Sequence, residues 1–516
     1  MTDSQFLIDE NTKLKEKVIL LQKENDFLRE KFKLAQHRQF GASSEKSPDQ
    51  TDWLFNEAET TVDAAEPESD TAVTTAATET DLESTVTSTK KKTGRKPLPA
   101  DLPRETHLID LSDAEKICPC CNGDLHKIGE EKSEQLAFIP ASLKVIETLR
   151  PKYACRACEK NNTATPIVIA PMPASPIPKS MATPSLLAYI IGNKYQLALP
   201  LYRQEIVFKQ LNIDLNRNTM SNWIMRSADV LEKLLQRVKI TLLTQTAIHA
   251  DETPVTVLQD EKNTHYMWVY CSGRDSPDPN SPANNIVIYD YQPSREGACP
   301  KRFLGDYKDY LQVDGYAAYA STHATLAGCM AHARRKFIDA QKIQPKGKIG
   351  RADWAIAQIK KLYIIEAQIS DKTPEEKYAL RQLHSLPLLS EFKVWLDKSA
   401  LQTNPKSTIG EAVSYTLRQW EKLITYTQHG QLCIDNNRAE RAVKPFVIGR
   451  KNWLFSNTAS GARASAILYS IIETAKANGL NPVKYVEHLL TEIPKRNADD
   501  VLEDLMPWVV RLGGDD

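Results

Sequence analysis

The chain has 516 residues, too many for one hydrophobic core, so we expect several domains. Its hydrophobic fraction of 41% is ordinary, no apolar run approaches the roughly 20 residues of a membrane span, and the charged N-terminus is unlike a secretory signal. Composition therefore argues against the integral membrane and secreted classes, and we expect a cytoplasmic protein with no membrane partner.

The formal net charge is zero, but the charges are unevenly distributed along the chain. Residues 47–89 carry a charge of −11, residues 497–516 carry −5 and residues 1–46 carry +1, so residues 90–496 must carry +15. A folded region with this positive charge attracts an anionic polymer, and nucleic acid is therefore the candidate partner.

A heptad repeat opens the chain over residues 1–40. Leucine recurs at every seventh position, at Leu7, Leu14, Leu21 and Leu28. The complementary positions are Asn11, Val18, Asn25 and Phe32. This pattern predicts a leucine-zipper coiled coil that joins chains into a homodimer or higher oligomer, and the asparagines favour the two-stranded form. The alternative is a lone amphipathic helix that packs on its own chain.

Residues 45–92 are rich in Thr, Ala and Glu, cannot bury enough apolar area to fold, and are predicted to be a disordered acidic linker.

A zinc-binding domain is predicted over residues 93–175. It contains two CxxC pairs separated by strand-like sequence, at Cys118, Cys121, Cys155 and Cys158. Four thiolates on two turns can surround a structural Zn²⁺ ion, and without a secretory signal disulfides are not expected. A redox CxxC is the alternative, and DNA contact by the module stays open.

Residues 180–240 are helical in period, and two helices joined around residues 212–217 have the proportions of a helix-turn-helix. The second helix should begin at a cap, Asn218 or Thr219. It would turn three side chains outward to DNA, Ser221, Asn222 and Arg226. Its inward side would carry Trp223, Ile224 and Leu231. A solvated polar face is the alternative.

From residue 244 to 345 the pattern becomes strand-like: three strands, a helix, a fourth strand, and a fifth strand that runs into a basic helix. This order is that of the ribonuclease H-like fold, in which the first and fourth strands are neighbours. Asp251 lies on the first strand and Asp314 just past the fourth, so we expect the two carboxylates to meet. Glu252 should face the opposite way, because successive strand residues alternate.

Residues 350–427 read as a helical insertion, residues 430–494 as the second part of the core, and residues 495–516 as an acidic C-terminal tail. Asp435 can cap a short helix that Pro445 would end after about two turns. Glu440 lies within that helix, and spacing alone would make it a salt-bridge partner of Arg441 or Lys444.

Long motifs carry a family resemblance. The sequences HADETP, QVDGYAAY, AHARRKF, CIDNNRAERAVKPFVIGRKNWLF and SGARASAILYSIIETAKANGLNP resemble motifs of the insertion sequence 66 family of transposases, and the CxxC pairs with GRKPLPADLPR resemble the family's N-terminal part. The resemblance, to the large C-type subunit, extends from the zipper to about Pro494. It implies that Asp251, Asp314 and Glu440 form a DDE triad that holds two Mg²⁺ ions, with Mn²⁺ able to substitute.

The resemblance also implies the reaction. Water frees a 3′ hydroxyl at the element's end, and that hydroxyl attacks target DNA. Bacterial nucleoid DNA would be the partner, together with two small accessory proteins of the same element. Basic side chains near the acids are candidates for contacts with DNA phosphates, namely Arg334, Arg335, Arg450 and Lys451, with a generic basic surface as the alternative.

The predicted fold class is therefore multidomain α/β: a ribonuclease H-like catalytic core with a helical insertion, preceded by a coiled coil, a zinc-binding module and a helix-turn-helix-like domain. Two other functions remain open from the sequence. One is a sequence-specific DNA-binding regulator with an inactive nuclease fold. The other is a ribonuclease H-like nuclease that cuts DNA without joining it.

Overall fold

The computed structural model describes residues 3–40, 143–153, 168–260, 264–277, 283–344, 350–497 and 500–512. The chain divides into two compact units, Met1–Phe55 with Met172–Asp516, and Asn56–Pro171. In the second unit, the described residues contain an antiparallel pair, β1 (Lys152–Tyr153) and β2 (Val168–Ile169). The predicted linker and the four CxxC cysteines lie outside the described residues.

The first unit is built around a mixed five-stranded sheet with strand order β5-β4-β3-β6-β7. Three antiparallel strands come first along the chain, β3 (Ala247–Thr256), β4 (Thr264–Ser272) and β5 (Ile286–Gln292). The helix α7 (Ala298–Leu304) leads to β6 (Tyr310–Gln312), which pairs parallel with β3. A 3₁₀ helix, η2 (Ala317–Ser321), precedes β7 (Thr325–Ala327), which pairs parallel with β6. The chain is thus mixed α/β.

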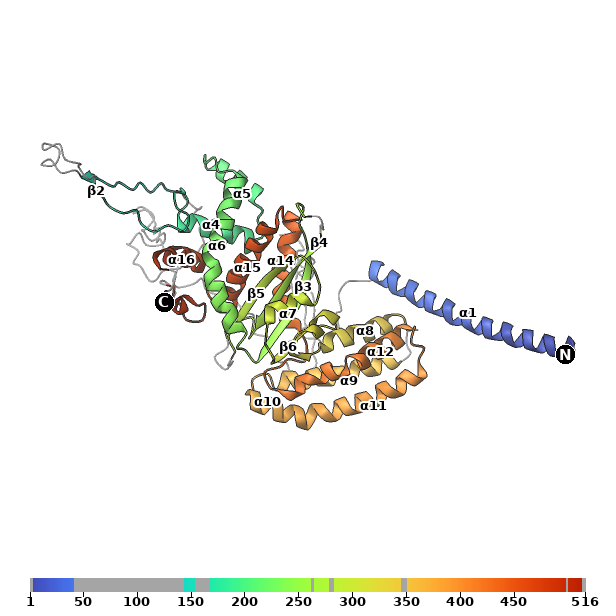
Figure 1. Ribbon diagram of the computed structural model, residues 1–516. Helices are drawn as coiled ribbons and strands as arrows, with labels where there is room; N and C mark the ends of the chain where they lie inside the picture. Colours follow the sequence, from blue (N-terminus) through green and yellow to red (C-terminus); the bar gives the residue numbers. More distant parts are fainter. Residues whose placement is uncertain are drawn as a thin grey trace, which may run out of the picture. The chain divides into compact units, whose positions relative to one another are not determined.

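The helix α15 (Ala459–Ala477) packs along the edge strand β5 (Figure 1). Its hydroxyls bond to the strand's backbone: the Tyr289 amide donates to Ser470 Oγ at 2.8 Å, and the Val287 amide donates to Thr474 Oγ1 at 3.1 Å. The long helix α6 (Arg217–Leu242) packs on α15 in the same core, and α16 (Pro482–Glu492) packs on α4 (Pro184–Tyr195). Covering the free edge of β5 leaves it unable to pair with another chain.

The predicted helix-turn-helix corresponds to α5 (Leu201–Gln210) and α6. The prediction of the cap was wrong by two or three positions, because Asn216 caps α6 and its side chain accepts from the Thr219 amide at 2.9 Å. The helix also runs on to Leu242, since Leu231, Leu235 and Val238 continue its buried stripe into the main core.

A helical subdomain follows the sheet and has a hydrophobic core of its own. Figure 1 shows five of its helices packed together: α8 (Met330–Lys342), α9 (Arg351–Gln368), α10 (Pro374–Leu380), α11 (Leu386–Gln402) and α12 (Thr408–Arg418). The short helix α13 (Trp420–Ile424) follows α12. A π-helical turn, η3 (Arg381–Ser385), joins α10 to α11, and η4 (Thr425–Gln428) follows α13. Arg381 is 2% exposed and ties the subdomain together by donating to Glu366 at 2.6 and 2.9 Å and to three backbone carbonyls.

The last described residues do not behave as a free tail. After η5 (Ile493–Lys495), the segment 500–512 contains η6 (Glu503–Leu505), with Leu505 and Met506 buried in the main core. The Tyr485 hydroxyl of α16 donates to the Leu505 carbonyl at 2.7 Å. The prediction of a tail was wrong because it relied on the acidic residues of the segment and overlooked its apolar residues, which pack against the main core. Among the described residues, no helix is long and apolar enough to cross a membrane.

The predicted heptad falls in one helix, α1 (Asp3–Phe40). Its seam residues Leu14, Leu21 and Leu28 are 57%, 53% and 60% exposed. Near the other end, Lys31 pairs with Glu411 of α12 at 2.8 Å. The apolar seam of the zipper is therefore open over most of its length.

Candidate active site

Asp251 lies on β3, and Asp314 lies two residues past the end of β6, the parallel strand beside it. The register pairs His249 with Gln312, and each aspartate lies two residues further along its chain. Asp251 Oδ1 accepts the Glu252 amide at 2.9 Å, and Asp314 Oδ1 accepts the Tyr316 amide at 2.8 Å. Both carboxylates therefore lie at the same end of the β3–β6 pair, each held by a nearby amide.

Glu440 lies on α14 (Asn437–Trp453), and hydrogen bonds just before this helix fix the position of its start. The buried side chain of Asn436 accepts from His249 Nδ1 at 3.1 Å and donates to the Ala250 carbonyl at 2.8 Å. Both partners immediately precede Asp251 on β3. The start of α14 is thus bound to the strand that carries the first aspartate.

A second anchor fixes the segment leading into α14. The fully buried side chain of Gln312, on β6, donates to the Cys433 and Asp435 carbonyls, the latter at 2.9 Å, and accepts the Cys433 amide at 3.1 Å. Asp435 in turn accepts from the Tyr363 hydroxyl of α9 at 3.0 Å. Together these bonds tie β6, the helical subdomain and α14 to one another.

The prediction that Pro445 ends this helix was wrong, since α14 continues to Trp453 with the proline inside it. The helix is capped at Asn436 and not at Asp435 as predicted, although Asp435 Oδ1 does accept the Asn437 amide at 3.1 Å. Proline removes the amide that would bond to the Arg441 carbonyl, and tertiary contacts support the helix beside this gap: the Tyr289 hydroxyl donates to the next carbonyl, that of Ala442. Packing of Phe446 against Tyr469 of α15, at 5.5 Å between ring centroids, adds to this.

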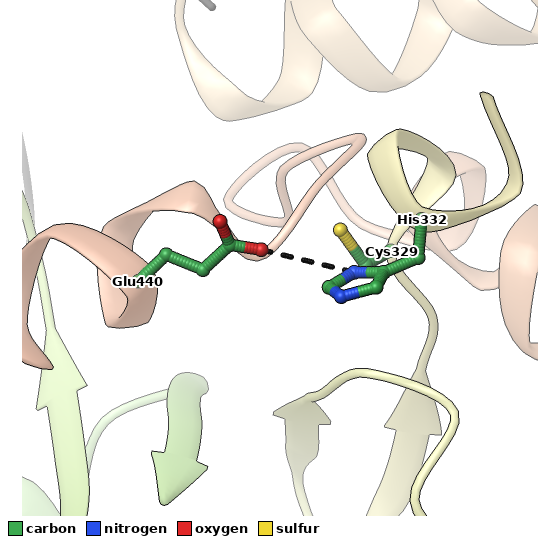
Figure 2. A group of neighbouring side chains, drawn as sticks. All are labelled: Cys329, His332 and Glu440. Carbon is green, nitrogen blue, oxygen red and sulfur yellow. Dashed lines mark ion pairs between the residues drawn. The ribbon is translucent and has the colours of Figure 1, made fainter. Parts of the chain in front are cut away.

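The local surroundings of Glu440 differ from those that spacing suggests. Arg441 Nε donates to Asp275 at 2.6 Å instead of pairing with Glu440. Two side chains of α8 lie closest to the Glu440 carboxylate. His332 Nδ1 lies 3.7 Å from Oε1 (Figure 2). An Arg335 nitrogen lies 3.9 Å from Oε2. The Glu440 side chain is 25% exposed and turns toward α8, so it is not a solvated helix-surface carboxylate.

The three acids influence one another electrostatically. Burial raises the pKa of Asp251 to about 7, and the charges of Glu252, Asp314 and Glu440 act in the same direction. Burial also raises the pKa of Glu440, against the opposing effect of Arg335. Within the described part of the chain, one group of three side chains places its possible metal-ligand atoms within 4.8 Å of one another. It consists of Cys329, His332 and Glu440 and does not include the two aspartates.

Glu252 points away from this site, as the alternation of a strand requires. Its side chain is 2% exposed and accepts from Arg295 Nε at 2.8 Å and from the Tyr319 hydroxyl at 2.6 Å. Its carboxylate is therefore held by partners of its own, whereas the charges of both Asp314 and Glu440 act on Asp251.

Comparison with known proteins identifies the family. A family model described as "Transposase IS66 family" matches residues 179–464, more than half of the chain and all of the sites above. The chain belongs to the IS66 family of transposases. Three further models match: a zinc-finger binding domain of transposase IS66 at residues 115–159, a "Transposase C of IS166 homeodomain" at residues 27–106, and an IS66 C-terminal element at residues 470–508.

Similar curated proteins are themselves uncharacterized. The protein y4jD of Sinorhizobium fredii is 34% identical over 423 residues, 80% of this chain and 81% of its own. The protein y4qI of the same organism is 30% identical over 500 residues, 92% of this chain and 87% of its own. No solved structure matches the chain. The family inferred from the motifs is confirmed, and its last element extends past Pro494.

The zinc-finger match of this IS66-family protein spans all four CxxC cysteines, Cys118, Cys121, Cys155 and Cys158, which indicates zinc binding. In the helix-turn-helix, Asn222 and Arg226 are exposed and Ser221 is half-buried, while Trp223 and Ile224 are buried.

The four basic residues predicted near the acids differ from one another. Arg335 and Lys451 are exposed. Arg450 bonds instead to β3, through Thr253 Oγ1 at 3.3 Å and the Pro254 carbonyl. Arg334 is 8% exposed, unlike the surface position supposed for it, because it lies one turn from Met330 on the buried stripe of α8.

Sequence reasoning missed the residues that join α14 to β3 and β6, namely Asn436, Gln312 and His249. A signal for Asn436 existed, since the motif containing Glu440 has two consecutive asparagines before its helix, and their amides suit backbone carbonyls.

Proposed function

We propose that this IS66-family protein is the DDE transposase of a bacterial insertion sequence, which cuts the element's ends and joins each 3′ hydroxyl to target DNA. The observation that carries the proposal is the pairing of β3, which carries Asp251, with β6, which leads directly to Asp314, while Asn436 bonds the start of the Glu440 helix to β3. We further propose that the five-stranded sheet is a ribonuclease H-like core, because its strand order and directions agree with that fold.

The residues present fit a site for divalent cations. Each aspartate uses one oxygen for a local amide, and among the described residues its other oxygen has no further hydrogen bond. Glu440 Oε1 is buried without a hydrogen-bond partner. A buried carboxylate whose pKa is raised by neighbouring acids, as that of Asp251 is, is stabilised when a cation neutralises the group. Oxygen ligands of this kind suit Mg²⁺, with Mn²⁺ as its substitute.

Bound divalent ions would supply activation of the attacking oxygen and stabilisation of the leaving oxygen at phosphorus. The chain's own contribution is rigid placement. The sheet holds Asp251 and Asp314 in register, and Asn436 holds α14 so that Glu440 stays beside them. The exposed guanidinium of Arg335, 3.9 Å from Glu440, is placed to contact a DNA phosphate near the reacting bond.

The other domains would deliver DNA to this site. We propose that the zinc module is held by its four cysteines and that α6 contacts DNA through Ser221, Asn222 and Arg226. The exposed seam of α1 would join two or more chains. Lys451 is a candidate phosphate contact, whereas Arg334 and Arg450 serve the fold in this conformation. The protein would act on nucleoid DNA, together with two small accessory proteins of the same element.

A strand-transfer assay tests the proposal. Labelled element ends, a target plasmid and Mg²⁺ are incubated with the full chain, with and without the accessory proteins. Joined product that is lost in Asp251→Asn supports a transposase. Cleavage without joining would indicate a nuclease, and specific DNA binding without chemistry would indicate a regulator. The matched control is Asp290→Asn, the same substitution on strand β5 of the same sheet, which should retain joining.

A further inference from the structure

A second cluster of metal-ligand side chains adjoins the carboxylate site and shares one member with it. Cys329 precedes α8, His332 lies in the first turn of α8, and Glu440 lies on α14 (Figure 2). One donor atom from each lies within 4.8 Å of the other two, and His332 Nδ1 is 3.7 Å from Glu440 Oε1. A thiol, an imidazole and a carboxylate therefore converge from two helices.

Two atoms of the cluster are buried and unsatisfied. His332 Nδ1 and Glu440 Oε1 each lack solvent access and a hydrogen-bond partner. At 3.7 Å they are too far apart to bond to each other well. Leaving buried polar atoms unpaired costs free energy, so an atom that bonds to both is expected between them.

The sulfur has partners suited to the same role. Cys329 Sγ accepts the Asn436 amide at 3.2 Å and the backbone amide of His332. Burial raises the pKa of the Cys329 thiol to about 12 despite these two amides, so a metal ion would have to displace its proton on binding. Once formed, the thiolate would keep both hydrogen bonds, and outer bonds of this kind orient metal ligands and stabilise their charge.

The separations suit a zinc ion. Zinc binds His nitrogen and carboxylate oxygen at about 2.0–2.2 Å and thiolate sulfur at about 2.3 Å, so two ligands of one ion lie up to about 4.4 Å apart. The observed 3.7 Å between His332 and Glu440 falls inside this limit. The outer bound of 4.8 Å for the whole cluster requires movements of only a few tenths of an ångström.

We propose that Cys329, His332 and Glu440 bind a soft divalent transition metal ion, with Zn²⁺ as the probe, and that this ion withdraws Glu440 from the triad and inhibits strand transfer. Thiolate and imidazole select Zn²⁺ over Mg²⁺, so Mg²⁺ does not fill the site. The inhibition rests on the proposed function, whereas the binding does not.

Binding is measured on the full chain with Co²⁺, whose bond to thiolate gives a charge-transfer absorption. The spectrum of Cys329→Ser is subtracted from that of the wild type, and the CxxC cysteines cancel because both proteins keep them. Cys299→Ser is the matched control, since Cys299 is also buried, at 3% against 2%, and lies on α7. We expect a difference band that Cys299→Ser does not remove.

A second variant keeps the proposal testable if Cys329→Ser does not fold. His332→Gln should weaken binding of the additional Co²⁺ or Zn²⁺ equivalent by at least about 10-fold. Equal metal stoichiometry and affinity in wild type, Cys329→Ser and His332→Gln would refute the site.

Inhibition is measured as strand transfer at fixed Mg²⁺ and rising Zn²⁺, with each variant normalised to its own activity without Zn²⁺. The concentration for half inhibition should rise at least about 10-fold in Cys329→Ser and stay unchanged in Cys299→Ser. Equal inhibition of all three proteins would refute the link to Glu440. If the wild type joins no DNA while the cobalt band persists, the transposase proposal fails and the metal site stands.

Discussion

Replacing Asn436 with alanine should loosen α14 and displace Glu440 without touching any of the three acids. The side chain is 1% exposed and makes two bonds to β3, to His249 Nδ1 at 3.1 Å and to the Ala250 carbonyl at 2.8 Å. Alanine removes both bonds and leaves two buried groups without partners.

The expected cost follows from those two bonds. Leaving a buried group without its partner costs about 1–3 kcal/mol, so the two groups together cost about 2–6 kcal/mol, and we take about 3 kcal/mol as a conservative value. The loss is local, because the affected bonds join one helix start to one strand. A local opening that is about 3 kcal/mol easier corresponds to amide hydrogen exchange about 100-fold faster over the first turns of α14.

Hydrogen exchange with mass spectrometry measures this directly, and strand transfer is measured on the same sample. The matched control is Asn478→Ala, which also removes two side-chain bonds, to the Asn285 and Thr474 carbonyls at 2.7 and 2.8 Å, at the end of α15. It should speed exchange there and leave strand transfer intact. Unchanged exchange in α14 of Asn436→Ala, or full strand transfer despite faster exchange, would refute the claim that Asn436 positions α14.

Three further predictions follow from single side chains. The pKa of Asp251 is raised by burial to about 7 from its ordinary value of 3.8, so the metal-free fold favours its protonated form and loses stability as pH rises from about 4 to 7. Asp251→Asn without metal should therefore melt above the wild type, by a margin that widens from pH 5 to pH 8; a margin independent of pH would contradict this. Arg381→Met leaves Glu366, whose side chain is 15% exposed, and three backbone carbonyls without their donor, and should destabilise the helical subdomain by about 3 kcal/mol; faster limited proteolysis after residue 350 would show it, and unaltered cleavage would contradict it. Leu21→Lys in the exposed seam of α1 should lower the mass measured by light scattering toward that of one chain, and an unchanged oligomer would place the interface elsewhere.

The strand pattern was sufficient to bring the two aspartates together. Apolar and β-branched runs bounded by turn signals located β3 and β6, and the order of elements made them neighbours, so the sequence alone could place the strands leading to Asp251 and Asp314 side by side. The alternation of side chains along a strand separated Glu252 from its neighbour, and its bonds to Arg295 and Tyr319 agree with that orientation.

The position of Glu440 could not be predicted from local sequence, because contacts distant in the chain determine it. Asn436 reaches back to β3, and Gln312 reaches forward to the segment before α14, each across more than a hundred residues. The same contacts explain the error at Pro445: the local rule ends a helix at proline, whereas tertiary bonds carry α14 through it. The surface position predicted for Arg334 was wrong because the prediction used its charge and not the helical spacing that places it on the buried stripe of α8.

The central claim is that Glu440 acts with the two aspartates in metal-dependent strand transfer, and single-turnover joining by Glu440→Gln tests it most directly. The control is Glu473→Gln on α15, a carboxylate that is also partly buried but paired with Lys476 away from the site. If Glu440 stabilises the transition state by several kcal/mol, Glu440→Gln should join at least about 100-fold more slowly while Glu473→Gln joins at the wild-type rate. Joining by Glu440→Gln at the wild-type rate would contradict the account.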